Sequence, residues 1–519
     1  MSVDFVIPDD LRRLGIHIVS GKGTGKSRFM GRLLSFQDVR RGIPTVIIDP
    51  KGQTITNLLD RILRLPEVDQ LELWPRIRYV EMIGRNGYIM PFPIYYRQGN
   101  ESYMKIAKRV IELIRRDNPQ LEDAPVNGMN AIRTVAWHAG IVLFALGLQI
   151  TEADHLLAHP DQWKERLHNL QAADTSLEIQ QACDFFLNRY TRSQGTAFQN
   201  KLPLFTLDPA SRVIFGASKP GIDLREVVQG GLAVLIDLSG ESDKQLRAFN
   251  MRWLFQYLMT YIEMVRDGRP NPLSLIIDEL NGIYRTGDEE FHNEMDDLIH
   301  ETARNYNVWL TLAHQEMHQF DEDTQRVLMT TGTQIIGRTD DPKTARYYAH
   351  HFHDFDEDWV RYTTPQIGHQ SVDGMSYPVV LGEKPTHFSA DEQERLEMPK
   401  FRRRSPLRFL AKLAESDDLR PIRLVGEDIT RDIDRVQVER AKDILMRRFG
   451  VAITDVEQEI RARLSNKALP VAPASLEYEV PTGYEIQRQG GDDEDPVFKA
   501  SRTGTGEKQQ APVRENAAG

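Results

Sequence analysis

The chain of 519 residues contains one cysteine, Cys183. A single cysteine cannot form an intramolecular disulfide, so the framework of a small secreted protein is excluded and a reducing compartment is favoured. The N-terminus lacks the apolar core of a signal peptide, because Asp4, Asp9 and Asp10 lie within it. We therefore expect a cytoplasmic protein, or one held at the inner face of the membrane through partners.

Long hydrophobic runs are also missing. The most apolar stretch, Val135–Leu148, is 14 residues long and contains Trp137 and His138. A helix that spans a membrane needs about 20 apolar residues. We expect a buried core helix at this place and no transmembrane segment in this chain.

An excess of positive charge is absent. The 65 Lys and Arg residues are outnumbered by 76 Asp and Glu residues, which gives a formal net charge of −11. This balance excludes a generally basic nucleic-acid binder, although a local basic channel is compatible with it, because the field at a surface depends on where its charges lie.

Strand and helix patterns divide the chain into five parts. Residues 1–100 read as α/β, residues 101–210 as an all-α insert domain, and residues 211–400 as the second part of the α/β domain. Residues 401–465 have a charged, helical period and predict a helical extension, while residues 466–519 are rich in Pro, Gly and charge and predict a disordered tail.

The expected fold class is α/β. Short apolar runs with intervening amphipathic stretches favour a mainly parallel sheet that is covered on both faces. The candidate strands are Leu14–Val19, Thr45–Ile48, Ile77–Val80, Leu232–Leu238, Leu273–Ile277, Val308–Leu312 and Gln334–Ile336.

The first chemical motif is Ser20–Ser27, which matches the phosphate loop G-x-x-x-x-G-K-[ST] except that Ser20 replaces the first glycine. Loop amides at a helix N-terminus bind anions, Lys26 would reach the β and γ phosphates, and Ser27 would ligate Mg²⁺. The alternative is a glycine-rich turn before an ordinary helix. The residues expected to bind ATP are Gly21, Lys22, Gly23, Thr24, Gly25, Lys26 and Ser27.

The second motif is Asp278-Glu279, which ends an apolar run 252 residues after Lys26. Asp278 is predicted to hold Mg²⁺ and Glu279 to polarise the attacking water as a general base. An acidic pair that caps a strand is the alternative for this motif taken alone.

Polar residues near the next two strands extend the site. Gln315 follows the strand Val308–Leu312 and could sense the γ-phosphate or orient water. Arg304 is a candidate arginine finger that reaches into a neighbouring subunit, and Arg338 is a second candidate. A solvent-exposed glutamine and solvated ion pairs are the alternatives. The basic run Arg402-Arg403-Arg404 is either a DNA contact or a solvated face.

The chain resembles the HerA/FtsK superfamily of DNA-pumping ATPases, and within it the coupling proteins of conjugative and type IV secretion systems (the TraD/TraG group). The motifs that carry the resemblance are Gly21–Ser27, Val46–Gly52, Met90–Pro93, Gly230–Ser239, Asp278-Glu279 and Ala303–Gln315. The resemblance implies a RecA-like ATPase domain with an all-α insert, ATP and Mg²⁺ as cofactors, and hexameric rings with nucleotide at the subunit interfaces. It places Arg304 in trans and Gln315 at the γ-phosphate.

The function expected from this resemblance is an ATP-driven DNA translocase that serves conjugative transfer. Two alternatives stay open: a HerA-like helicase or packaging motor that works with a nuclease or capsid, and a nucleotide-switched docking protein without motor activity. Expected partners are DNA without sequence preference, further copies of the chain, and a relaxase, secretion channel or nuclease.

Overall fold

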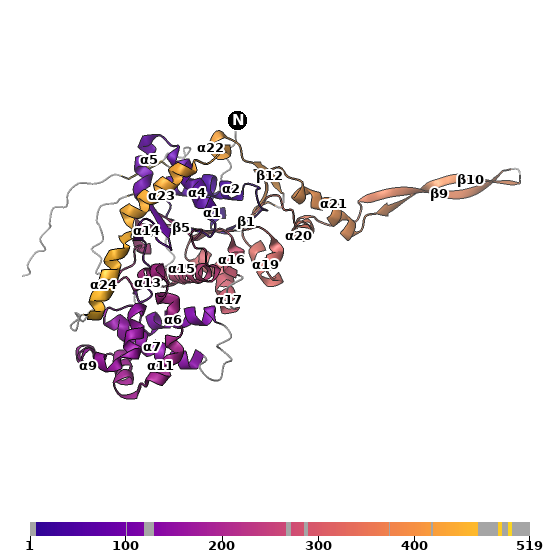
Figure 1. The fold of residues 1–519 in the computed structure, drawn as a ribbon. Helices are drawn as coiled ribbons and strands as arrows, with labels where there is room; N and C mark the ends of the chain where they lie inside the picture. Colours follow the sequence, from indigo (N-terminus) through magenta and orange to yellow (C-terminus); the bar gives the residue numbers. More distant parts are fainter. Residues whose placement is uncertain are drawn as a thin grey trace, which may run out of the picture. The chain divides into compact units, whose positions relative to one another are not determined.

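The structure is a computed structural model (Figure 1) that describes residues 7–99, 101–118, 129–265, 271–284, 289–372, 374–416, 419–465, 486–489 and 497–500. It contains two units, Met1–Pro473 and Ala474–Gly519. In the second unit, the described residues form strands β14 (Ile486–Gln489) and β15 (Val497–Ala500), which pair antiparallel. The rest of the tail predicted to be disordered lies outside the described residues.

A nine-stranded sheet with the order β12-β11-β8-β1-β7-β6-β2-β5-β3 is the centre of the first unit. Seven of its strands are parallel and coincide with the seven predicted runs. They are β1 (Ile16–Val19), β2 (Thr45–Asp49), β3 (Ile77–Glu81), β5 (Ala233–Asp237), β6 (Leu273–Ile277), β7 (Val308–His314) and β8 (Thr333–Ile336). Almost every residue of these strands is buried, because both faces of a parallel sheet are covered. The predicted α/β fold class is confirmed.

The helices that connect these strands pack on both faces of the sheet. Before β5 they are α1 (Asp9–Arg12), α2 (Lys26–Phe29), η1 (Met30–Ser35), α3 (Phe36–Arg41), α4 (Gln53–Leu63), α5 (Glu67–Leu73), η2 (Trp74–Arg76) and α14 (Leu224–Gln229). After β5 they are α15 (Lys244–Val265), α16 (Leu280–Tyr284), α17 (Glu289–Asp297), η7 (Leu298–Thr302), α18 (Ala303–Asn305), η8 (Met317–Gln319), α19 (Glu322–Met329), α20 (Pro342–Phe352) and α21 (Ala390–Arg402).

Helices fill the segment between β3 and β5. They are α6 (Tyr103–Asp117), α7 (Met129–Ala145), η4 (Ile150–Glu152), α8 (Ala153–Ala158), η5 (Pro160–Trp163), α9 (Lys164–Ala173), α10 (Leu177–Asp184), η6 (Phe185–Arg189), α11 (Arg192–Gln199), α12 (Pro203–Thr206) and α13 (Pro209–Gly216). In Figure 1 they gather below the sheet. α7 covers most of the candidate Val135–Leu148 and is largely buried, as expected for a core helix.

Among the helices of the described residues, none alone is both long and apolar enough to cross a membrane. Met129–Ala145 and Ile150–Ala158 are long and apolar enough only when taken together, as a pair bent by 117°.

The helical period predicted for residues 401–465 is wrong over the first part of that segment. β11 (Arg408–Leu413) and β12 (Arg420–Arg423) add two antiparallel strands to the sheet beside β8. β12 is the edge strand, with three of its four residues exposed, and β11 carries the exposed Arg408 and the half-buried Lys412, so the segment looks like a solvated helix in sequence. Helices follow at α22 (Glu427–Thr430), α23 (Arg435–Phe449) and α24 (Ile453–Ser465), with the short strand β13 (Val451–Ala452) paired to β4 (Tyr88–Ile89).

The helices α23 and α24 connect the sheet to the helical insert. On α23, the buried Lys442 donates to Asp237 at the end of β5, with 3.0 Å between Nζ and Oδ2. On α24, the buried Arg463 pairs with Glu152 of the insert at 3.0 Å and also donates to the carbonyl of Gly216. Since buried charges are stable only when paired, these contacts hold the two parts in one arrangement.

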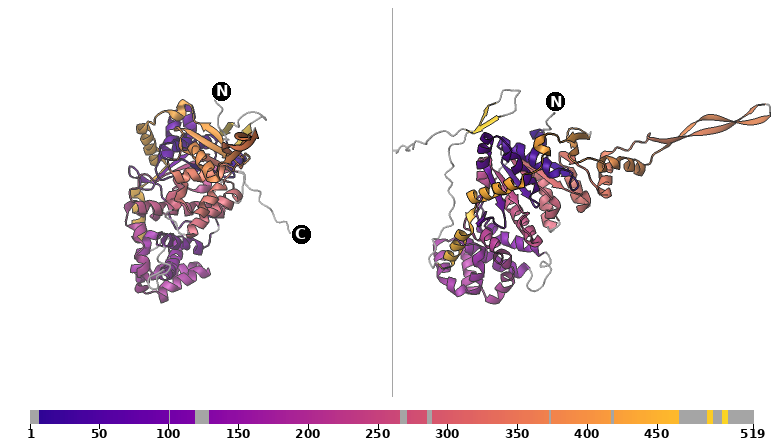
Figure 2. Two further views of the ribbon diagram at one scale, coloured as in Figure 1. Left: turned by 90° about the vertical axis from the view of Figure 1, so that its right-hand side faces the viewer. Right: turned by 45° about the horizontal axis from the view of Figure 1, so that its top comes forward.

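A long hairpin was not predicted from the sequence. β9 (Val360–Val372) and β10 (Met375–His387) pair antiparallel, and nearly all their side chains are exposed. Figures 1 and 2 show the hairpin extending away from the sheet and its helices. Its strands carry apolar residues on both faces, so the alternation that reveals a half-buried strand is missing from the sequence.

Candidate functional site

The phosphate loop joins β1 to α2 at the carboxyl edge of the sheet. Gly25 has a φ of 103°, a left-handed conformation that favours glycine. A methyl group at Gly25 would also overlap the side chain of Leu407, whose N–H donates to the Thr24 carbonyl at 2.8 Å. The chain before β11 thus closes over the loop. Sequence reasoning missed Leu407, which no motif marks.

Ser20, the one departure from the phosphate-loop pattern, is fully buried. Its hydroxyl hydrogen-bonds to the Thr24 hydroxyl, and Thr24 also donates to the Gly21 carbonyl at 2.7 Å. Space for the Ser20 side chain exists because residue 337 on the neighbouring chain segment is glycine: a methyl group on Gly337 would overlap Ser20 Oγ. Ser20 therefore replaces glycine without displacing the loop, and it ties the two ends of the loop together.

Lys26 and Asp278 form a buried ion pair beneath the loop. Asp278 also accepts from the Thr54 hydroxyl at 2.8 Å and from the Glu279 N–H at 2.9 Å. Burial opposes the charge on both partners, but their attraction is stronger, so the pKa of Lys26 is raised and the pKa of Asp278 is lowered. Both groups are charged at neutral pH. Thr54, at the start of α4, was not expected from the sequence.

Three side chains converge on one oxygen of Glu279. Lys51 Nζ and Gln315 Nε2 each lie 2.8 Å from Glu279 Oε1, and Lys26 Nζ lies at 3.7 Å. Glu279 has a φ of 55°, a conformation that costs a non-glycine residue about 1–2 kcal/mol. Such strain persists where surrounding contacts hold it, and it is found most often at functional sites. Lys51 lies in the Val46–Gly52 motif, but its contact with Glu279 could not be inferred from the sequence.

Asp49, at the end of β2, lies between the acidic residues at the ends of β6 and β5. Burial and the nearby Asp278 raise the pKa of Asp49 to about 7. Asp49 accepts from the N–H groups of Lys51 at 3.0 Å and Thr54 at 2.7 Å. It thereby positions Thr54, which contacts Asp278, and Lys51, which contacts Glu279.

A buried histidine pair lies under the loop. Gln334 Nε2 donates to Leu328 O at 3.1 Å, which leaves Gln334 Oε1 to accept from His17 Nδ1 at 2.6 Å. His17 Nε2 must then accept from His314 Nε2, at 2.7 Å. The His314 carbonyl accepts from the Ser20 N–H at 3.2 Å, and His314 precedes Gln315. Burial lowers the pKa of His17 to about 4 and that of His314 well below its usual value, so the pair is neutral near pH 7.

The two candidate arginine fingers contribute no side chain to this cluster. Arg304 is exposed on α18, which precedes β7, and therefore lies at the amino end of the parallel strands, opposite the loop. A strand of seven residues spans about 23 Å, so Arg304 cannot reach the phosphate loop of its own chain. The Arg338 carbonyl accepts from the Gly21 N–H at 2.8 Å, while its side chain contacts Asp340. The structure thus brings Lys26, Asp278, Glu279 and Gln315 together and leaves Arg304 outside.

The residues of the cluster fit a nucleoside triphosphate with Mg²⁺. The first N–H groups of the helix that begins at Lys26 have no helical carbonyl to donate to, and they are available to phosphate oxygens. A methyl group on Gly23 would meet nothing within 4 Å, so the outer side of the loop is open. The Ser27 hydroxyl, at the start of α2, and the Asp278 carboxylate are oxygen ligands of the kind that Mg²⁺ prefers.

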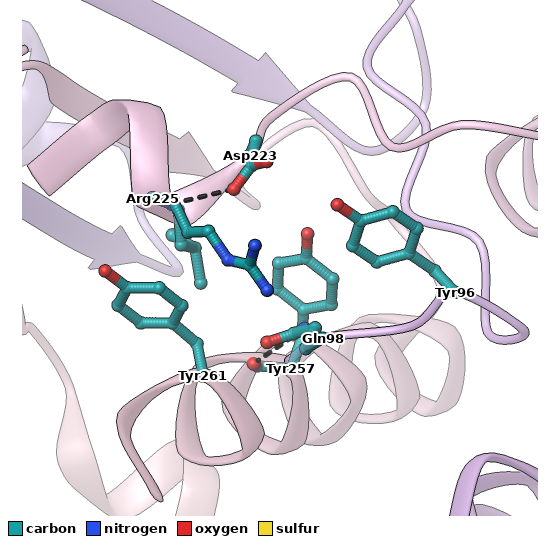
Figure 3. A pocket seen from close by; sticks show the side chains of 7 residues that line it. Tyr96, Gln98, Asp223, Arg225, Tyr257 and Tyr261 are labelled. Carbon is teal, nitrogen blue, oxygen red and sulfur yellow. Dashed lines mark hydrogen bonds between the residues drawn. The ribbon is translucent and has the colours of Figure 1, made fainter. Parts of the chain in front are cut away.

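A separate hollow lies between α14, α15 and the segment that leads into α6 (Figure 3). It is lined by Tyr96, Gln98, Asp223, Leu224, Arg225, Tyr257 and Tyr261. The Arg225 N–H donates to Asp223 at 2.8 Å, as expected for the start of a helix. None of the residues predicted for the nucleotide site lines this hollow.

Comparison with known proteins finds similarity in structure alone, since no family model and no curated protein matches the sequence. The unbound bacterial conjugative coupling protein TrwB is similar at 13% identity and a TM-score of 0.48, over 84% of this chain and 90% of that one. TrwB with the ATP analogue ADPNP is similar at 12% identity and a TM-score of 0.46, over 84% and 92%. VirB4 of Thermoanaerobacter pseudethanolicus is similar at 13% identity and a TM-score of 0.45, over 79% and 89%.

TrwB is a conjugative coupling protein, the group that the motifs of this chain resemble. With identities of 12–13% and TM-scores below 0.5, function has to be inferred from the residues of this chain.

The contact between Ser20 and Gly337 predicts an interaction between two mutations. Gly337→Ala should displace Ser20 and lower the affinity of the loop for an ATP analogue about 10-fold, whereas Ser20→Gly should have little effect. Directly contacting residues commonly couple by 0.5–3 kcal/mol, so the double variant should recover most of the affinity. Titration with a fluorescent ATP analogue measures all four proteins. Equal losses in the single Gly337→Ala variant and the double variant would refute the explanation of Ser20.

The histidine pair predicts a loss of stability in acid. Because the pKa of His17 is lower in the folded chain than its usual 6.5, its contribution is complete above pH 6.5 and falls as the pH drops towards 4. At pH 5 this loss amounts to about 2 kcal/mol. His17→Gln can keep both hydrogen bonds but cannot titrate, so its unfolding free energy should fall less between pH 7.5 and pH 5. Parallel denaturation curves at both pH values test this, and identical losses in the two proteins would contradict it.

Proposed function

We propose that the chain is an ATP-hydrolysing motor that translocates DNA, as a coupling protein in conjugative transfer or type IV secretion. The observation that supports this most directly is the cluster of Lys26, Asp278, Glu279 and Gln315 at one edge of the sheet. Each residue type matches one requirement of phosphoryl transfer: charge on the phosphates, a metal ligand, a base, and an amide near the γ-phosphate.

In this mechanism the amides of residues 22–27 and the Lys26 ammonium bind the phosphates of ATP, while the Gly21 N–H, expected from the sequence to take part, donates to the Arg338 carbonyl instead. Ser27 and Asp278 would hold Mg²⁺, which would supply positive charge to the phosphates during transfer. Glu279 accepts a proton from the attacking water. Gln315 and Lys51 orient the Glu279 carboxylate through its Oε1 atom, which leaves Oε2 for that proton.

The DNA part of the proposal rests on the family resemblance and on one basic surface. Arg402 and Arg403 are exposed at the end of α21, and Arg408 is exposed at the start of β11. Between them, Leu407 contacts the phosphate loop at Gly25. A phosphate backbone bound at this basic run would therefore lie close to the site of hydrolysis, and its affinity should fall steeply with salt.

The position of Arg304 also favours assembly of several copies of the chain. Arg304 lies at the far end of the sheet from its own phosphate loop, so it can act as an arginine finger only on another chain. We propose that copies form a ring, a homo-hexamer by the family resemblance, in which Arg304 of one copy completes the site of the next. A relaxase or a secretion channel is the expected partner of such a motor.

Activity assays test the motor directly. Glu279→Gln should bind ATP but hydrolyse it at least 100-fold more slowly, because a positioned general base contributes about 10²–10⁴-fold. Lys26→Ala should lose nucleotide binding, and the exposed Glu165→Gln on α9 should behave as wild type. Hydrolysis by the wild-type chain should rise several-fold with single- or double-stranded DNA. A rate that DNA leaves unchanged would instead favour a nucleotide-switched docking protein.

Mixed assemblies test Arg304. Arg304→Ala and Lys26→Ala should each be inactive alone, the first with nucleotide binding intact. In a mixture, a boundary between an intact loop and an intact Arg304 reappears, so part of the activity should return. Undiminished hydrolysis by Arg304→Ala, or no recovery in mixtures shown to co-assemble, would exclude the role in trans.

A further inference from the structure

The β9–β10 hairpin is the largest exposed apolar feature of the described residues. Its exposed large apolar side chains are Val360, Tyr362, Ile367, Val372, Met375, Tyr377, Val380 and Leu381. Ile367 pairs directly with Val380, and Val372 pairs with Met375 on the other face. A two-stranded hairpin is marginally stable in water by itself, so a covering surface is expected for this arm.

The charges of the arm indicate that it binds a protein surface. Within the described strands the charged side chains are the two cations Arg361 and Lys384 and the one anion Glu383. Arg361 already pairs with Glu392 of α21. So small a cationic excess does not make a binding arm for phosphates, whereas exposed apolar residues on both faces suit burial against protein.

An apolar surface that fits the arm lies at the opposite end of the sheet. α5 leads through η2 into the edge strand β3, and its Val68 and Leu71 are 71% and 67% exposed, one turn apart. α23 packs against β3, and its Val436 is 77% exposed. In Figure 1 and in the right-hand view of Figure 2, α5 and α23 lie on the opposite side of the sheet from the arm.

Size and local charge suit the two surfaces to each other. α5 carries the acids Glu67, Asp69 and Glu72 and no basic residue, so it can pair with Lys384 of β10, whereas Arg361 already pairs with Glu392. Strands of 13 residues extend about 44 Å, and a ribbon two strands wide offers about 400 Å² on each face. Both faces together reach the roughly 800 Å² that one partner contributes to a standard interface.

We propose that the β9–β10 arm of one copy docks on the α5–α23 surface of the next copy. The two surfaces differ and lie at opposite ends of the sheet, so the contact is head to tail, and it closes into a ring if the rotation between copies permits. This inference deepens the proposed function, because it names the contact that would build the ring of the motor.

Paired charge substitutions test the contact in the full chain. Ile367→Glu/Val380→Glu on the arm and Val68→Glu/Leu71→Glu on α5 should each raise the concentration at which the assembly dissociates at least 10-fold. Leu177→Glu/Leu207→Glu adds the same number of charges at two exposed leucines of the insert, outside both surfaces, and should have little effect. Light scattering over a concentration series measures the mass.

Mixing separates a head-to-tail contact from other arrangements. The arm variant keeps an intact α5–α23 surface and the α5 variant keeps an intact arm, so the two monomers together should form dimers but no ring. An arm that pairs with a second arm would give no such recovery. Dimers therefore support the proposal, and their absence overturns it.

Cross-linking identifies the surface that the arm contacts. The only native cysteine, Cys183, is buried, so cysteines introduced at Val380 and Leu71 should react with each other alone. Disulfides between copies that carry one cysteine each support the contact. The proposed contact is overturned if the wild-type chain is monomeric at all concentrations. It is also overturned if two Val380→Cys copies cross-link to each other, or if the tail of the same chain captures the arm. Binding of an ATP analogue to the monomeric variants separates this outcome from the proposed function, which fails if no nucleotide binds.

Discussion

The buried ion pair between Lys26 and Asp278 is the interaction on which the rest of the site depends. Lys26 begins the helix after β1 and Asp278 follows β6, two strands that are separated in the sheet by β7. A charge buried without its partner is strongly destabilising, so the ends of these strands must stay in register. Thr54 holds Asp278 by a further hydrogen bond, and Lys51 and Gln315 fix the second carboxylate, Glu279, beside it. The site is thus a network of charged groups that only a correctly ordered sheet can satisfy.

Packing around the phosphate loop explains how the chain accommodates its departure from the usual pattern. Ser20 needs room at Gly337 and a partner at Thr24, and both are present. Leu407 covers Gly25 from the segment that leads into β11, far along the chain. His314 joins the loop to Gln315 through its own carbonyl and its place in the sequence. The loop and Gln315 are thus joined directly through the ends of β1 and β7.

Buried ion pairs connect the parts of the molecule outside the sheet to the site. Lys442 and Arg463 hold the C-terminal helices to the sheet and to the helical insert. The insert is therefore connected to the end of β5, near the carboxylates of the site. The arm and the α5–α23 surface extend the same molecule at its two ends, where a head-to-tail neighbour would meet them.

The sequence by itself determined the parallel strands, the phosphate loop and the acidic pair, because their signals are local: buried runs, glycine spacing and adjacent carboxylates. The convergence of Lys51 and Gln315 on Glu279 was decided by the tertiary structure, since strand order places residues from four parts of the chain at one edge. Two further elements also depended on it. The strands β11 and β12, at one end of the sheet, have charged residues that resemble a solvated helix in sequence. The exposed arm lacks the alternation that a buried face imposes on a strand, and its pairing becomes visible only when the whole chain is folded.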